Sequence, residues 1–100
     1  MNISAPTPEN WPFDQAPNVA AITSKQVLAG ATITHVYHFD DDDSWVFLHD
    51  VGISNDDGQV IGMGTALKID SSLRGIADLP TGWMATRTGL DSPWIRSLDS

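Results

Sequence analysis

The three histidines are the side chains of this chain best suited to metal binding or proton transfer, because imidazole does both near neutral pH. A hairpin that pairs Phe39 with Trp45 places His35 and His49 on one face and His38 on the other. Zinc needs three or four converging ligands, so this pattern predicts no metal site. A small metal-dependent hydrolase or a ligand-binding accessory domain that uses the His35/His49 face stays open as the alternative function.

The acidic residues suggest calcium binding at first sight. Four aspartates are consecutive: Asp40, Asp41, Asp42 and Asp43. A calcium-binding EF-hand loop needs spaced acidic groups and a glycine at its sixth position. The run has no such glycine, and aligning Gly58 of the SNDDG cluster with that position puts Ile53 at the first ligand position. We therefore expect a solvated turn at the end of a hairpin rather than a calcium site.

Nucleophilic and cofactor motifs are incomplete. The sequence has no GxSxG pattern, and neither Ser24 nor Ser44 has an evident histidine and acid beside it. Residues 62–64 begin a glycine-rich loop, but Leu67 stands where its last glycine belongs. A hydrolase with paired carboxylates stays open, because a count of carboxylates does not give their geometry. The sequence predicts no cofactor and no enzyme.

Tryptophan and arginine near the end of the chain favour recognition instead. On a strand, Trp83 and Arg87 share one face, and both residue types are enriched at binding hot spots. Trp94 lies in a polar stretch and is a second candidate anchor. In the alternative interpretation Trp83 fills the core, and Arg87 pairs with a local carboxylate such as Asp78 or Asp91.

Net charge restricts the partners. Thirteen acidic residues against five basic ones give a net charge of -8. Such a chain is a poor ligand for nucleic acid or an anionic membrane surface, whereas a basic protein would be attracted to it. Acidic charge also serves solubility alone. The absence of cysteine, of a signal peptide and of a long apolar run predicts a cytoplasmic protein.

The first half of the sequence predicts an N-terminal arm and a β-hairpin as the elements that position the candidate residues. Residues 1–17 hold four of the six prolines, which predicts a Pro-rich arm that Trp11 and Phe13 anchor, followed by a single domain over residues 18–100. Residues 19–22 suit a strand, and Thr23 or Ser24 caps a helix over residues 25–29 that ends at Gly30. Residues 31–39 and 45–51 alternate as a hairpin, with Tyr37 opposite Phe47 and His35 opposite His49.

The second half predicts short helices and a last strand. Residues 60–67 have helical spacing that two glycines weaken, so a strand or turn is an alternative there. Asp70 caps a short helix that Pro80 ends, residues 83–87 form a strand, and a polar tail follows Gly89. The predicted fold is α+β: an antiparallel sheet with a central β-hairpin and two or three short helices packed on one face.

Five segments in order, AITSKQVL, ITHVYH, DDSWVFL, LKIDSSL and ADLPTGWMATR, followed by a late tryptophan, resemble a family of small bacterial proteins of unknown function. This family is associated with polymorphic-toxin immunity and is sometimes called immunity protein thirty-three. The resemblance covers Val19 to Trp94. Its most specific parts are W-x-F-L at residues 45–48 and D-L-P-x-G-W-x-A-x-R at residues 78–87.

The resemblance implies a compact α+β domain and, for some members, inhibition of a toxin by direct binding; it supplies no catalytic residue. We therefore expect a non-enzymatic immunity protein whose partner is a basic toxin domain. The four aspartates at residues 40–43 would steer that partner electrostatically. Trp83, Arg87 or Trp94 would supply its anchor contacts.

Overall fold

Short strands build the sheet at the centre of the protein. The computed structural model describes residues 11–13, 15–41, 43–49 and 58–98. The elements in these ranges are, in chain order, β1 (Ala20–Ser24), α1 (Lys25–Leu28), β2 (His35–His38), β3 (Trp45–Leu48), β4 (Gly58–Gly62), α2 (Met63–Ile69), the 3-10 helix η2 (Ser71–Ile76), β5 (Trp83–Thr86) and β6 (Ile95–Leu98). The predicted α+β class is confirmed.

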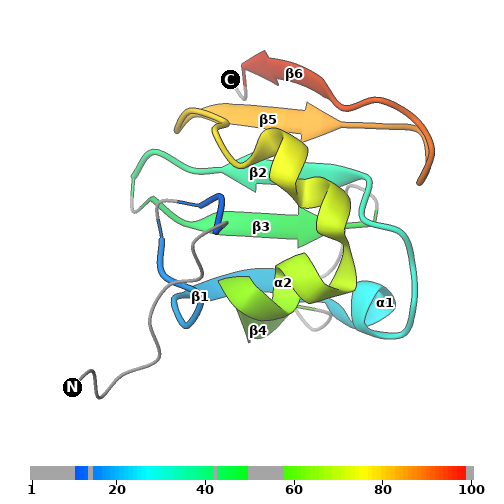
Figure 1. The fold of residues 1–100 in the computed structure, drawn as a ribbon, viewed down its shortest axis with the longest axis horizontal. Helices are drawn as coiled ribbons and strands as arrows, with labels where there is room; N and C mark the ends of the chain where they lie inside the picture. Colours follow the sequence, from blue (N-terminus) through cyan, green and yellow to red (C-terminus); the bar gives the residue numbers. More distant parts are fainter. Residues whose placement is uncertain (1–10, 14, 42, 50–57, 99–100) are drawn as a thin grey trace.

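The six described strands form one sheet in the order β4-β1-β3-β2-β5-β6, and α2 and η2 lie across one of its faces (Figure 1). All neighbouring pairs are antiparallel except β1 and β3. The sheet is therefore mixed, whereas the sequence predicted an antiparallel one. The parallel pair arises because α1 turns the chain back into β2, and β3 then returns between β2 and β1.

Local capping explains where the helices begin. The Ser24 side chain accepts a hydrogen bond from the Val27 N–H (3.2 Å) at the start of α1, and Gly30 follows that helix with a φ of 115°. Asp70 accepts a bond from the Ser72 N–H (2.9 Å) at the start of η2. Both predicted N-caps are confirmed, and the second helix has the tighter 3-10 form.

The predicted hairpin exists, but its predicted register is wrong by one residue. His38 lies opposite Trp45 and Val36 opposite Phe47, whereas the sequence prediction placed Phe39 opposite Trp45. The reason is a shorter turn: the Phe39 N–H donates to the Ser44 carbonyl (2.9 Å), so Phe39 is bonded to Ser44 and does not face Trp45. Asp43 makes this turn possible by adopting a left-handed conformation with a φ of 61°.

The core lies between the sheet and the helices. Strand residues Ala21, Val36, Trp45, Phe47 and Ala85 meet Met63, Ala66, Leu73 and Ile76 of the helices there. Phe13 also belongs to this core: it is 5% exposed, and its ring meets Trp45 edge-on with 5.2 Å between centroids. The segment predicted as an arm therefore supplies a core residue, whose burial contributes about 1.5–3 kcal/mol.

Two further segments supply the edge strands of the sheet. Residues 60–67 divide at Gly62 into the end of β4 and the start of α2, so Val60 lies on an edge strand and is 68% exposed. The stretch after Gly89, predicted as a polar tail, contains β6, which pairs with β5 at the other edge of the sheet. Arg96 of β6 donates at the surface to the Gly75 carbonyl (2.8 Å) and to Asp78 (2.5 Å). None of the described helices is long and apolar enough to cross a membrane.

Candidate interaction surface

The face of the sheet turned away from α2 and η2 carries a row of apolar side chains. Cross-strand partners share a face: Val46 pairs with both Ile22 and Tyr37, and Tyr37 pairs with Met84. All four are partly exposed. Their neighbours in the chain, Ala21, Val36, Phe47 and Ala85, are at most 1% exposed and face the helices. At these positions the outer side chains are thus more exposed than the side chains that face the helices.

We call this outer surface the open face. Its central row crosses all six strands and consists of Val60, Ile22, Val46, Tyr37, Met84 and Ser97. Phe39 extends it beyond the end of β2, stacking on Tyr37 with 5.9 Å between centroids and 4° between planes. The row contains no charged residue. Aromatic residues and methionine are enriched, and most charged residues depleted, at the centre of protein interfaces.

Two of the predicted steering aspartates border the open face. Asp40 and Asp41 follow Phe39 directly and are exposed. Asp43 is exposed as well, but its carboxylate accepts a hydrogen bond from Gln15 (2.8 Å) and lies 2.6 Å from Nε2 of His38, and these contacts fix it in place. Asp42 lies outside the described residues. The tip of the hairpin therefore places carboxylates beside exposed aromatic rings.

His38 connects the hairpin tip to the core. Its ring is buried against Trp45, with 4.1 Å between centroids and 15° between planes. Nδ1 lies 2.7 Å from the Leu79 carbonyl, and Nε2 lies 2.6 Å from the Asp43 carboxylate. A carbonyl only accepts hydrogen bonds, so Nδ1 carries a proton; the contact with Asp43 then places a second proton on Nε2 or on the carboxylate. His38 is thus a structural connector.

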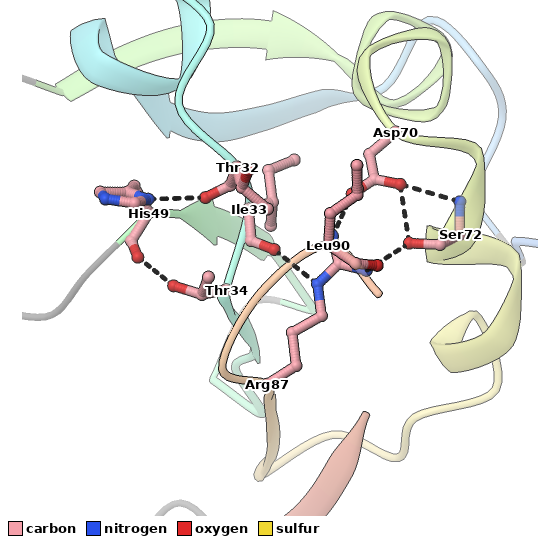
Figure 2. A network of polar contacts seen from close by, with 8 residues as sticks. All are labelled: Thr32, Ile33, Thr34, His49, Asp70, Ser72, Arg87 and Leu90. Carbon is pink, nitrogen blue, oxygen red and sulfur yellow. Dashed lines mark hydrogen bonds and ion pairs between the residues drawn. The ribbon is translucent and has the colours of Figure 1, made fainter. Parts of the chain in front are cut away.

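The predicted pairing of His35 with His49 is wrong, because the observed register places His35 opposite Leu48. Nδ1 of His49 bonds to the Thr32 carbonyl (2.8 Å), as Figure 2 shows. The Thr34 hydroxyl donates to the His49 carbonyl and thus accepts from Nδ1 of His35 (2.9 Å). Among the described residues, no group of three or more His, Cys, Asp or Glu side chains is placed to hold a metal ion.

Arg87 lies inside the protein and not at its surface, so the predicted partner anchor has an internal role. The residue is 5% exposed. Its guanidinium donates to the Ile33 carbonyl (2.9 Å), the Ser72 hydroxyl (2.8 Å), the Leu90 carbonyl (3.3 Å) and the Asp70 carboxylate (Figure 2). In the alternative interpretation Arg87 pairs with a carboxylate of the chain. It does, but the carboxylate is that of Asp70 and not of Asp78 or Asp91.

The two predicted tryptophan anchors are both half-buried and pack against the core. Trp83 shares its face with His38, its cross-strand partner. Trp94 lies beside the Arg87 guanidinium, with its ring centroid 4.2 Å from Cζ. The structure therefore separates these indoles from the open face, which sequence reasoning missed. The signal for the open face was that the hairpin strands carry apolar residues at positions of both faces, such as Val36 and the adjacent Tyr37.

Comparison of the chain with protein-family models, with curated proteins and with solved structures found no match in any of the three. The resemblance to the immunity family stays a prediction.

Proposed function

We propose that this chain is a non-enzymatic protein-binding domain whose open face docks a protein partner. The observation that supports the proposal is the uncharged and mostly apolar row, together with the stack of the partly exposed Tyr37 on the exposed Phe39. Folded proteins seldom leave a continuous apolar patch in water unless it contacts another molecule. The row lies on strands, and this gives it the fixed shape that a specific interface needs.

The partner that fits this surface has an apolar patch bordered by lysines or arginines. Asp40 and Asp41 stand at one end of the open face and would meet those cations. Association with a second copy is disfavoured, because each chain has a net charge of -8. A basic toxin domain has the required character, so the proposal includes the immunity role that the sequence resemblance implies.

A matched pair of substitutions tests the proposal. Phe39 is 38% exposed and belongs to the open face, whereas Leu90 is 62% exposed and lies in the loop before β6. Replacing either by lysine adds one positive charge at an exposed apolar site. We expect the tagged wild-type and Leu90→Lys chains to capture the same partner from the native lysate, identified by mass spectrometry, and Phe39→Lys to lose it.

Association kinetics then test the role of the aspartates, and cell survival tests the immunity role. Replacing Asp40 and Asp41 by asparagine should mainly slow association, and should flatten its dependence on salt. If the captured protein is a toxin, co-expression with wild-type chain should protect cells and co-expression with Phe39→Lys should not. Equal capture by Phe39→Lys would refute docking at the open face, and a partner with no toxicity would refute the immunity role.

A further inference from the structure

A pocket of about 460 Å³ lies on the helical side of the sheet, away from the open face. Trp11 and Pro17 line it from the N-terminal segment. Helix α2 contributes Gly64, Thr65, Leu67 and Lys68, and η2 contributes Ser71 and Arg74. Its volume falls within the range of roughly 300–1,000 Å³ that small-molecule sites occupy. The pocket is therefore large enough for a ring-sized ligand.

The walls of the pocket are held by hydrogen bonds to backbone carbonyls. The Gly64 N–H donates to the Pro17 carbonyl (2.8 Å), and the indole N–H of Trp11 donates to the Gln15 carbonyl (2.7 Å). A Cβ atom at Gly64 would come within 3.3 Å of Pro17 Cβ, so glycine lets the N-terminal segment lie directly on α2. The pocket is thus preformed and does not need a ligand to shape it.

The charge of the pocket is opposite to that of the whole chain. Two of the five basic residues, Lys68 and Arg74, line it, and among the residues that the structure describes no acidic one does. A cationic pocket on a chain with a net charge of -8 is a place where a small anion meets local attraction despite the overall repulsion.

The other residues that line the pocket indicate which chemical groups a ligand would carry besides the anion. Trp11, Pro17 and the buried Leu67 offer apolar surface, and the hydroxyls of Thr65 and Ser71 can bond to an anionic oxygen. We infer that the pocket binds a small ligand with a flat apolar body and one anionic group, a carboxylate or a phosphate. The body lies against Trp11, and the anion faces Lys68 and Arg74. This site is independent of the proposed protein interface.

NMR titration of the full chain with three probes tests the inference. Benzoate and phenyl phosphate carry the anion on a flat ring, and benzamide is the neutral counterpart of benzoate. We expect both anions to shift the indole N–H signal of Trp11 and the amide signals of Gly64 and Ser71. Benzamide should bind about tenfold more weakly, because it lacks the charge that two cations attract. The tighter of the two anions identifies the group that the pocket prefers.

Two lysine variants provide the control. Lys68→Met should weaken benzoate binding about fivefold, the upper range for a solvent-exposed charge pair. Lys25→Met makes the same change of net charge at an exposed position on α1, outside the pocket, and should leave the affinity unchanged. Equal binding of benzoate and benzamide, equal losses in the two variants, or no shift of the Trp11 signal at millimolar probe would each overturn the inference.

Discussion

Replacing Arg87 by methionine should cost more stability than most single substitutions in this chain. Methionine keeps an apolar stem but removes every hydrogen bond of the guanidinium. The side chain of Asp70 is 9% exposed and would lose its cation. Removing one partner of a buried ion pair costs about 3–5 kcal/mol. Because small domains have a total stability of about 5–15 kcal/mol, we expect a large decrease in the free energy of unfolding.

A second substitution isolates the cause of that loss. Asp70→Asn removes the charge but keeps an oxygen that accepts the Ser72 N–H at the start of η2. If the unpaired carboxylate dominates the cost, the double variant should be more stable than Arg87→Met alone, by about 1–3 kcal/mol. The free energies come from urea unfolding followed by tryptophan fluorescence, since Trp94 lies beside the guanidinium.

Arg96→Met is the matched control, because its guanidinium pairs with Asp78 at the surface and its loss should hardly move the unfolding midpoint. An Arg87→Met variant within about 1 kcal/mol of wild type, the range of exposed pairs, would refute the structural role of Arg87. A double variant less stable than Arg87→Met would refute the unpaired charge as the cause.

Three further predictions follow from single contacts. Hydrogen bonding and charge from Arg96 hold the pKa of Asp78 below 3.8. The stability gained from this pair is therefore present above that pH and is lost as the pH falls through the lowered pKa. Arg96→Met should return the pKa of Asp78 toward 3.8 in an NMR titration. Gly82 has a φ of 81°, so Gly82→Ala should lower stability by about 1–2 kcal/mol in urea unfolding, whereas Gly75→Ala meets no atom within 4 Å and should be tolerated. Phe47 is fully buried, and Phe47→Ala should cost about 3–5 kcal/mol in the same assay.

Features that depend on neighbouring residues could be predicted from the sequence. Ser24 and Asp70 cap helices because their side-chain oxygens reach backbone N–H groups two or three positions ahead. Gly30 and Gly82 adopt positive φ values, which glycine does without steric strain. These interactions span few residues, so composition and spacing determine them.

The alternation of residue types along the strands does not determine the hairpin register or which side of the sheet becomes the open face. Val36 and Tyr37 are both suited to a core, so alternation alone does not say which parity faces the helices. In the structure Asp43 takes a left-handed conformation, the turn closes with the bond between Phe39 and Ser44, and Val36 is the buried residue of the two. The role of Arg87 was hidden for another reason: its acceptor at Ile33 is 54 positions away, and no local pattern encodes that contact.

That long-range bond also bears on how the protein is made. The Ile33 carbonyl is synthesised long before the Arg87 guanidinium that binds it. At 5–20 residues per second, a ribosome needs roughly 3–10 s to cover that interval. Until β5 is synthesised, β2 lacks one of its two neighbours in the sheet. The nascent chain thus cannot complete its sheet before β5 and Arg87 have been synthesised, and until then it presents apolar surface of the kind that chaperones bind.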